Sequence, residues 1–399
     1  MFEGDPCTGL VSWTLELEQW MLVRVALLYC DVLNIGGVET HLLSLLRHGD
    51  SSRYRWHIFA HTSSAFRARA EELGAQVIPW GPKHAMDPFA VFRLMHLILK
   101  YRIDILHAHS LRGALFAQIV SGISKTRSIV TVHQPLCAFQ YENGSLGDCR
   151  RWYRLYITIA RVLNHMLTDK MIYVSSRAYK EARSECLPPL NRTVVIENGI
   201  DQRPYQDGPS SDAIRRSLGV AGETTVISCV ARLHEQKGID ILLSALHQLR
   251  ESNFNARVWV VGDGHLSDTL RRQAADLGLT EVVQFLGFRD DVPEILKSSD
   301  IFVLPSRFEA MSIGIMEAMA AGLPCVVTDV GENARMVEHG VNGFVIPPED
   351  PHSLVEALGY LLTDSALLKR MGQASRQKVE EYSDVPMAAQ TMNAYASVC

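Results

Sequence analysis

Residues 300–332 read DIFVLPSRFEAMSIGIMEAMAAGLPCVVTDVGE, and two different apolar periodicities follow each other in this stretch. The apolar run at 301–304 is short and is followed by a proline, which predicts a buried parallel strand. After a polar turn the apolar residues recur with a period of 3.6, which indicates a helix. The Gly-Leu-Pro sequence at 322–324 ends that helix, because glycine suits a left-handed cap and proline cannot continue the ladder. A second apolar run at 325–327 predicts another strand.

Two carboxylates stand eight positions apart in this stretch, Glu309 in the turn and Glu317 inside the helix. Both are expected near the carboxyl end of a parallel strand, which is where open α/β sheets bind ligands. Ionised carboxylates only accept hydrogen bonds, so the pair suits a hydroxyl-rich ligand such as a sugar or a ribose. Taken one at a time, each glutamate is more simply explained as a solvated charge.

The rest of the chain repeats this alternation of strand and helix. Further strands are expected at 22–30, 56–60, 76–80, 103–107, 128–132, 171–174, 194–196, 224–230, 257–261 and 283–286. Parallel strands joined by right-handed crossover helices form doubly wound sheets, and 399 residues are enough for two such domains. The segment 202–212 is rich in Pro, Gly, Ser and Asp and marks the boundary. We therefore predict an N-terminal domain at 21–200, a C-terminal domain at 201–385 and a last helix at 386–399.

Composition and charge argue against several classes of protein. The net charge of −5 and the isoelectric point near 6.3 argue against a nucleic-acid partner. The eight cysteines show no CxxC spacing, which favours a reducing compartment, and no apolar run reaches the roughly 20 residues of a membrane span. Residues 1–20 lack the pattern of a signal peptide, and we interpret them as an extension or a misassigned start. We expect a cytoplasmic protein.

Residues 149–167 combine basic and aromatic side chains. Four arginines in this segment are not balanced by any acid, a pattern typical of a helix that lies on the anionic inner face of a membrane. The alternative is a core helix that buries apolar residues such as Ile159, Val162 and Met166. We favour the core helix, although both can hold on opposite faces.

Two sets of residues suit the binding of phosphate. Gly36 and Gly37 follow the first predicted strand and open a helix, so that backbone N–H groups and a positive helix end come together. Arg232 and Lys237 occupy a strand-to-helix turn, where a guanidinium fork and an ammonium can meet two phosphates. Each signal is weak alone, since tight turns and solvated basic turns are common. Neither a G-x-G-x-x-G fingerprint nor a P-loop string occurs.

Three histidines stand at predicted strand ends, two in His107-Ala-His109 and one in Thr131-Val-His133. Alternate residues of a strand point the same way, so His107 and His109 can together ligate a metal ion. The sequence places no third ligand beside them, and we expect no metal site. Packed or hydrogen-bonded histidines are the simplest explanation.

In their order along the chain these motifs resemble those of the retaining glycosyltransferases of family 4. The E-x7-E stretch of that family usually reads E-G-F-G-x-x-x-x-E-A-M-A-x-G-x-P-V, and the matching positions are Glu309, Gly314, Glu317, Ala318, Met319, Ala320, Gly322 and Pro324. The family strings R-x-x-x-x-K-G and V-x-x-N-G-x-D match 232–238 and 195–201. In the first stretch the commoner glycine and aromatic residues are replaced by Ala310, Met311 and Ser312, which affects the lining of the donor pocket. The resemblance spans about 22–382.

The resemblance implies a GT-B fold, in which two Rossmann-like domains face a cleft and the last helix returns to the N-terminal domain. It implies metal-independent transfer of a sugar, with retention, from a nucleotide sugar that acts as a co-substrate; no cofactor is expected, and no D-x-D string occurs. Catalytic roles are implied for His133, Glu309, Arg232 and Lys237. Donor and nucleotide contacts are implied for Gly36, Gly37, Arg232, Lys237, Gly262, Gly264, Glu309, Ser312, Ile313 and Glu317. On the acceptor side the resemblance implies His107 and His109.

The donor is expected to be a UDP- or GDP-sugar and the acceptor a glycan or a lipid-linked glycan. Two alternatives remain open. A nonhydrolysing sugar-nucleotide epimerase shares the two-domain architecture and needs no acceptor. An inactive sugar-nucleotide-binding module would bind the donor without turnover.

Overall fold

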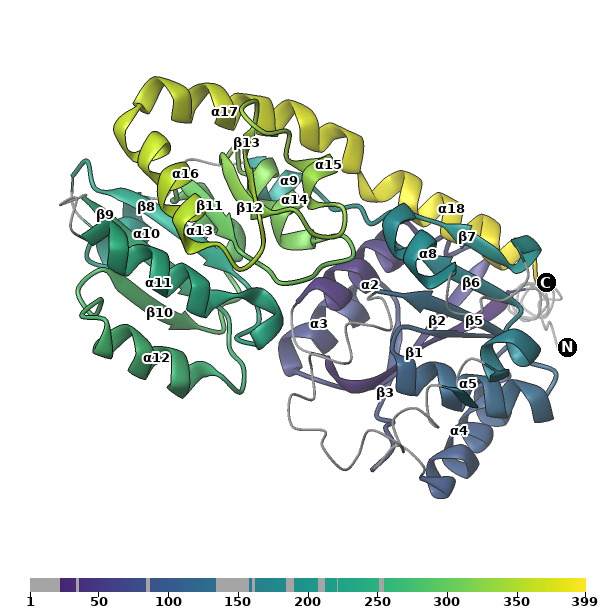
Figure 1. Cartoon of the computed structure of the whole chain (residues 1–399). Helices are drawn as coiled ribbons and strands as arrows, with labels where there is room; N and C mark the ends of the chain where they lie inside the picture. Colours follow the sequence, from purple (N-terminus) through teal and green to yellow (C-terminus); the bar gives the residue numbers. More distant parts are fainter. Residues whose placement is uncertain are drawn as a thin grey trace, which may run out of the picture.

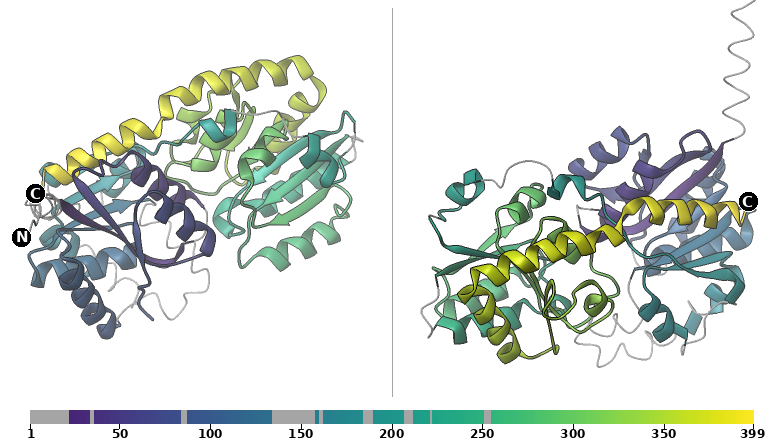
Figure 2. Two further views of the ribbon diagram at one scale, coloured as in Figure 1. Left: turned by 180° about the vertical axis from the view of Figure 1, so that it is seen from behind. Right: turned by 90° about the horizontal axis from the view of Figure 1, so that it is seen from above.

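The structure is a computed structural model, and it describes residues 22–33, 36–83, 87–133, 158–159, 162–183, 190–206, 212–220, 222–250 and 255–399. Two α/β domains lie side by side, and the long C-terminal helical segment runs along both of them (Figure 1). The view from above in Figure 2 shows the same segment crossing from one domain to the other.

The N-terminal domain contains a seven-stranded parallel sheet with the order β3-β2-β1-β4-β5-β6-β7. Its strands are β1 (Val23–Leu33), β2 (Tyr54–Thr62), β3 (Gln76–Ile78), β4 (Ile105–Ala108), β5 (Arg127–Val132), β6 (Lys170–Tyr173) and β7 (Thr193–Val195). The helices between them include α2 (Gly37–His48), α3 (Ser64–Glu72), α4 (Pro88–Tyr101), α5 (Leu111–Ile123) and α8 (Ser176–Arg183). Central strands such as β4 are buried along their whole length, which is why they read as continuous apolar runs.

The C-terminal domain contains a six-stranded parallel sheet with the order β10-β9-β8-β11-β12-β13. Its strands are β8 (Thr225–Val230), β9 (Ala256–Val261), β10 (Val283–Gly287), β11 (Ile301–Leu304), β12 (Cys325–Thr328) and β13 (Gly343–Ile346). Its helical elements include α9 (Arg203–Gln206), the 3-10 helix η3 (Glu235–Lys237), α11 (Ile239–Leu249), α14 (Ile313–Ala320), α16 (Pro351–Thr363) and α17 (Ser365–Lys378).

The strand order of each sheet reverses direction once, between β1 and β4 in the first sheet and between β8 and β11 in the second. Ligands of open α/β sheets bind outside the carboxyl ends of the strands at such a point. The elements that follow these strands are α2 after β1, η3 after β8 and α14 after β11. These elements contain the predicted site residues Gly37, Lys237, Ile313 and Glu317, and the turns before them contain Gly36, Arg232, Glu309 and Ser312.

The last helix, α18 (Asp384–Ala396), packs against α2 of the N-terminal domain. Met387 and Tyr395 are buried in the same apolar cluster as residues of β1 and β2. An ion pair of 2.8 Å between Arg47 of α2 and Asp201 of the linking segment lies on the same side. The chain that leaves the first domain near residue 200 thus comes back to it at its end.

The predicted fold class is confirmed: both parallel sheets are present, and each strand expected from an apolar run is found. One element differs from the amphipathic pattern. Helix α14 has buried residues on every side, including Glu317, because it lies between its sheet and neighbouring helices. Its period of 3.6 therefore does not mark a solvent-facing side.

Residues 149–167 lie largely outside the described residues, and the four arginines among them cannot be placed. Within the described part, Val162 and Met166 have exposed fractions of 50% and 65%. The expectation that these two side chains are buried in the core is therefore wrong. In the part of the chain that the structure describes, no helix combines the length and the apolar character needed to cross a membrane.

Candidate active site

Two helices, one from each domain, begin at nearly the same point. Gly37 is the first residue of α2 and Ile313 the first of α14, and a Cβ placed on Gly37 would lie 4.0 Å from that of Ile313. In neither helix does the residue before it, Gly36 or Ser312, cap a backbone N–H group with a side chain. Two positive helix ends and their N–H groups therefore converge, which favours a bound anion between the domains.

One carboxylate already lies at the start of α2. The Glu39 Oε2 atom is 3.0 Å from the position that a Cβ on Gly36 would take, and Glu39 is buried. An acid in the first turn suits the positive end of a helix. The first turn of α14 contains no acid. The negative charge of a phosphate group at this junction would therefore be repelled less at the start of α14 than at the start of α2.

Arg232 and Lys237 lie on the same turn but in different states. Arg232 is exposed, and within the described residues no hydrogen bond or ion pair holds its guanidinium. Lys237 has a side chain only 15% exposed, and its Nζ atom lies 2.6 Å from Glu309 Oε1. The Ser306 hydroxyl donates to the same oxygen at 2.7 Å. Arg232 is thus the freer cation, while Lys237 is matched by a carboxylate.

Two glycines that follow β9 allow the turn that contains Arg232 to lie close to the end of that strand. Gly262 has φ of 129°, and a Cβ there would meet the Ala231 carbonyl oxygen at 2.0 Å. A Cβ on Gly264 would meet the Leu233 carbonyl oxygen at 2.3 Å. Both contacts are too short for any side chain, so these two positions require glycine. The backbone at the end of β9 therefore packs directly against the backbone of the turn that contains Arg232.

Glu317 accepts a hydrogen bond of 2.8 Å from the hydroxyl of Tyr205, which lies on α9 just after the linking segment. Burial raises the pKa of Glu317 to about 7, although the Tyr205 hydrogen bond acts in the opposite direction. Its other oxygen can accept from the hydroxyls of a ligand. Tyr205 could not be selected from the sequence, because its only local context is a polar linker.

The ring nitrogens of His107 are not available to an acceptor substrate. Its ring is fully buried, with Nδ1 2.6 Å from the hydroxyl of Tyr395 and Nε2 2.7 Å from the hydroxyl of Thr131. This differs from the expected acceptor-side position, because both ring nitrogens are already used within the protein. His107 instead packs against His109, with ring centroids 4.0 Å apart.

His109 and His133 do come together, as His109 Nδ1 lies 3.0 Å from His133 Nε2. His41, from the first turns of α2, stacks edge-on against His133 at 4.9 Å between centroids. Burial lowers the pKa of His109 and His133 well below the ordinary value, and the neighbouring histidines add to the effect. Burial also lowers the pKa of His41 to about 4, although its hydrogen bond to Asn198 acts in the opposite direction. All three rings are therefore uncharged near neutral pH.

The orientation of His41 follows from its partner. Asn198 donates from Nδ2 to the carbonyl of Met311 at 3.2 Å, so its Oδ1 faces His41 Nδ1 at 3.1 Å. His41 must then donate from Nδ1, which leaves a lone pair on Nε2, a buried atom without a hydrogen-bond partner. Sequence reasoning missed His41, although its place four residues after the Gly-Gly turn was a usable signal.

The histidine cluster can also be judged as a metal site. Ligand nitrogens of His41, His109 and His133 all lie within 4.8 Å of one another, so His109 has the neighbouring ligands that the sequence did not show. A second set, His234, Glu235 and His265, meets the same distance limit on the surface beside the basic turn. The first set therefore does not contain the H-x-H pair, since His107 has both ring nitrogens bonded to Tyr395 and Thr131, and it joins His109 to His41 and His133 instead.

Family models match both halves of the chain. The model described as Glycosyltransferase Family 4 matches residues 35–203, and the one described as Glycosyl transferases group 1 matches residues 210–378. Together they match most of its length. The chain belongs to the group 1 glycosyltransferases of family 4. Its activity is therefore that of a glycosyltransferase.

Two relatives and one solved structure illustrate the membership. The UDP-Gal:alpha-D-GlcNAc-diphosphoundecaprenol alpha-1,3-galactosyltransferase of Escherichia coli is 29% identical over 298 residues, 73% of this chain and 75% of that protein. A GDP-mannose-dependent monoacylated alpha-(1-6)-phosphatidylinositol monomannoside mannosyltransferase of Corynebacterium glutamicum is 28% identical over 362 residues, 87% of this chain and 90% of that protein. A crystal structure of Anabaena HepE in complex with UDP-glucose covers 94% of this chain and 99% of its own, with a TM-score of 0.80 and 24% identity. The sequence resemblance implied a GT-B fold and membership of this family, and both are confirmed.

Proposed function

We propose that this glycosyltransferase transfers a sugar, with retention and without a metal ion, from a UDP- or GDP-sugar to a hydroxyl of a glycan or lipid-linked glycan. The observation that carries the proposal is the meeting of the α2 and α14 starts, with the turn of Arg232 and Lys237 joined to the loop before α14 through Lys237 and Glu309. A nucleoside diphosphate needs positive charge and N–H donors in this arrangement. Breaking the anomeric bond places extra negative charge on that leaving group, and preorganised donors stabilise the charge as it develops.

The remaining residues fit the two ends of such a donor. Glu317 would accept hydrogen bonds from the ribose with the oxygen that Tyr205 leaves free. Glu309 would accept from hydroxyls of the sugar, held in place by Lys237 and Ser306. His133 would lie against the transferred sugar as an uncharged ring. These roles follow the family resemblance, and the distances within each domain support them.

Metal independence is proposed because the protein itself supplies the positive charge. Arg232, Lys237 and the two helix ends would supply this charge, and no D-x-D string is present in the sequence. Turnover in EDTA is therefore expected to equal turnover in added Mg²⁺. A loss of turnover in EDTA that Mg²⁺ or Mn²⁺ restores would contradict this part of the proposal.

The donor is tested first by a thermal-shift panel of UDP, GDP, ADP and their sugar conjugates in EDTA. A ligand that binds only the folded state raises the unfolding midpoint by mass action. UDP is expected to give a shift, since the E. coli relative is named for UDP-Gal and the HepE crystal holds UDP-glucose. A shift from GDP alone would instead favour the donor named for the C. glutamicum relative. No shift from any nucleotide would contradict the donor site.

The acceptor requirement separates transfer from epimerisation. A transferase releases the nucleoside diphosphate only when an acceptor is present, whereas an epimerase changes the sugar of the donor without one. Incubation with a diphosphate-linked lipid glycan, followed by anomeric proton spectra of the product, tests both the acceptor class and retention. An altered nucleotide sugar formed without acceptor would support the epimerase.

A further inference from the structure

Three histidine rings converge at the carboxyl edge of the N-terminal sheet. His41 lies on α2, His109 directly after β4 and His133 directly after β5. One ring nitrogen from each lies within 4.8 Å of those of the other two. Helix α2 follows β1, and β1, β4 and β5 are consecutive in the sheet order, so one packed layer holds all three rings. The proposed function assigns a role only to His133, which leaves the other two rings to be explained.

The Nε2 atom of His41 is a buried electron-pair donor with nothing to accept its pair. Asn198 holds the ring proton of His41 on Nδ1, because its own amide group donates to the carbonyl of Met311. His41 is 2% exposed, and Nε2 has no hydrogen-bond partner among the described residues. A buried polar atom without a partner costs about 1–3 kcal/mol. A cation at this nitrogen would remove that cost.

His109 contributes a second such atom to the cluster. Its Nδ1 atom is 3.0 Å from Nε2 of His133, while its Nε2 atom is buried and has no hydrogen-bond partner in the described part of the chain. Burial lowers the pKa of all three rings, which are therefore uncharged near neutral pH. The cluster thus offers imidazole lone pairs rather than positive charge.

We propose that His41, His109 and His133 bind a transition-metal dication of the Zn²⁺ class, and that the bound ion inhibits the enzyme. Imidazole nitrogens suit Zn²⁺ and Cu²⁺, whereas Mg²⁺, Ca²⁺ and Mn²⁺ prefer oxygen ligands. Three protein ligands leave the fourth tetrahedral position of Zn²⁺ to water. Zn–N bonds of about 2.0–2.1 Å place tetrahedral nitrogens roughly 3.3 Å apart. The limit of 4.8 Å therefore leaves at most about 1.5 Å for any pair to close.

Asn198 supplies the outer contact that metal-binding histidines usually have. A ligating histidine donates its other N–H group to an oxygen acceptor, which fixes the tautomer and the orientation of the ring. Here the Oδ1 atom of Asn198 accepts from Nδ1 of His41 at 3.1 Å and leaves Nε2 for the ion. The ring is thus already oriented as a ligand.

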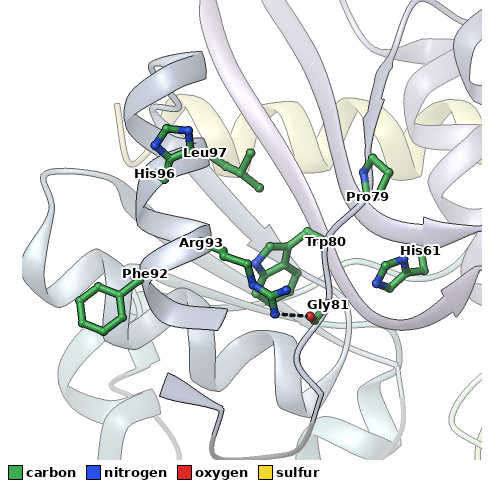
Figure 3. Close-up of a pocket in the computed structure, with 8 residues that line it drawn as sticks. All are labelled: His61, Pro79, Trp80, Gly81, Phe92, Arg93, His96 and Leu97. Carbon is green, nitrogen blue, oxygen red and sulfur yellow. Dashed lines mark hydrogen bonds between the residues drawn. The ribbon is translucent and has the colours of Figure 1, made fainter. Parts of the chain in front are cut away.

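Other histidines do not share this arrangement. Figure 3 shows His61 of β2 and His96 of α4 on different sides of a cavity of about 380 Å³, and among the described residues neither belongs to a group of three close ligands. In the surface set that contains His234, the Glu235 and His265 side chains are 45% and 56% exposed and bond each other at 3.0 Å. Water and that ion pair satisfy these groups, so they need no metal ion.

The inhibitory effect rests on the proposed function, in which His133 lies against the transferred sugar. An ion bound to this ring would occupy part of the space for the sugar. The sugar carries positive charge in the transition state of glycosyl transfer, so a dication beside it would also raise the barrier by repulsion. Bound Zn²⁺ should therefore lower turnover.

The direct test is calorimetric titration of the full chain with Zn²⁺ in the absence of nucleotide, after treatment with EDTA, desalting and removal of any polyhistidine tag. The wild type is expected to bind one Zn²⁺ per chain and to give no heat with Mg²⁺. Co²⁺ in its place should show the intense visible absorption of a tetrahedral site. His41→Gln should weaken Zn²⁺ binding by about 100-fold or more, because a ligand is lost, and Asn198→Leu by about tenfold.

His96→Gln and His265→Gln are the matched controls, because each removes an exposed histidine outside the cluster. Both should keep the Zn²⁺ affinity and the Co²⁺ spectrum of the wild type. The unfolding midpoint in EDTA shows whether each variant is folded, and His109→Gln replaces His41→Gln if that variant is not. No Zn²⁺ binding by the wild type would overturn the proposal, as would binding that is lost in His265→Gln and kept in His41→Gln.

Turnover in EDTA and then in excess free Zn²⁺ tests the inhibition. At ten times its dissociation constant, Zn²⁺ is expected to lower wild-type turnover by about tenfold at low donor concentration, and EDTA should restore it. The turnover of His41→Gln should be insensitive to the same Zn²⁺ concentration. Zn²⁺ that binds the cluster without inhibition, or that turnover requires, would overturn the inhibitory effect. Zn²⁺ binding without any nucleotide thermal shift would instead contradict the proposed function and support the ion site.

Discussion

At the scale of single residues, the pairing of Lys237 with Glu309 changes what a substitution at either position does. From the sequence Lys237 is an exposed charge that can be removed without effect on stability. In the structure it is largely buried against a carboxylate that is 6% exposed. The two residues are 72 positions apart, and no local pattern shows which residue on another loop will meet them. The sequence could single out these two residues as candidates, but it could not show that they are partners.

Lys237→Ala should therefore lower both stability and activity. Removing one member of a buried ion pair leaves the other without a partner, which costs about 3 kcal/mol of unfolding free energy. Loss of a charge beside the leaving group should lower turnover by about 10²-fold or more. The double variant Lys237→Ala/Glu309→Ala should recover part of the stability but none of the activity. Urea unfolding and steady-state turnover measure the two effects, and a fully stable, fully active Lys237→Ala would contradict both roles.

Glu317 gives the protein a pH signature of known sign. Its pKa in the folded state is raised to about 7 from an ordinary value of 4.5, so the folded protein binds the extra proton between these two values. Stability contributed by that proton is present below pH 4.5 and is lost as pH rises through 7. Glu317→Gln should therefore gain on the wild type by up to about 3 kcal/mol between pH 5 and 8. If the unfolding free energies of the wild type and Glu317→Gln change in parallel across this pH range, the raised pKa of Glu317 is contradicted.

Nucleotide affinity should increase with pH over the range in which the stability contributed by Glu317 decreases. The ionised carboxylate is the stronger acceptor for ribose hydroxyls, so binding should tighten as pH rises through about 7. Calorimetric titration of wild type and Glu317→Gln at pH 6 and pH 8 isolates this contribution, since other titrating groups are common to both. If the two proteins show the same change with pH, Glu317 does not contact the ribose.

At the scale of elements, the strands could be predicted because parallel strands buried on both faces read as short apolar runs. The burial of helices could not be predicted in the same way. Helix α14 is enclosed on every side, whereas α4 exposes an apolar face, and both have apolar residues at helical spacing. Which side of a helix is covered depends on distant elements. The return of α18 to the first domain is a contact of this kind.

Tyr395 is where α18 reaches the histidine cluster. Tyr395→Phe removes the hydroxyl bonded to His107 Nδ1 and leaves that buried nitrogen without a partner. The expected cost is about 1–3 kcal/mol of unfolding free energy, with reduced turnover because His107 supports His109. Tyr360→Phe, on the exposed side of α16, should change neither. A Tyr395→Phe protein as stable as the wild type would show that α18 holds by apolar packing alone.

At the scale of the whole molecule, Asn198 joins the two domains through hydrogen bonds to His41 and Met311. Asn198→Leu keeps the approximate size but removes both bonds, which should cost about 1–3 kcal/mol for each group left unpaired. The domains should also separate more readily, raising the radius of gyration of the free protein in X-ray scattering. The added nucleotide should partly reverse that increase. Scattering unchanged from the wild type would mean that other contacts set the domain spacing.

The central claim is that a nucleoside diphosphate binds between the starts of α2 and α14 without a metal ion. The direct test is a crystal structure grown in EDTA with the nucleotide that gives the largest thermal shift. The diphosphate is predicted to contact backbone N–H groups at Gly37 and at Ile313, with Arg232 against it and Glu317 on the ribose. A diphosphate bound elsewhere, or one held only through an ion on His41, His109 and His133, would contradict the account.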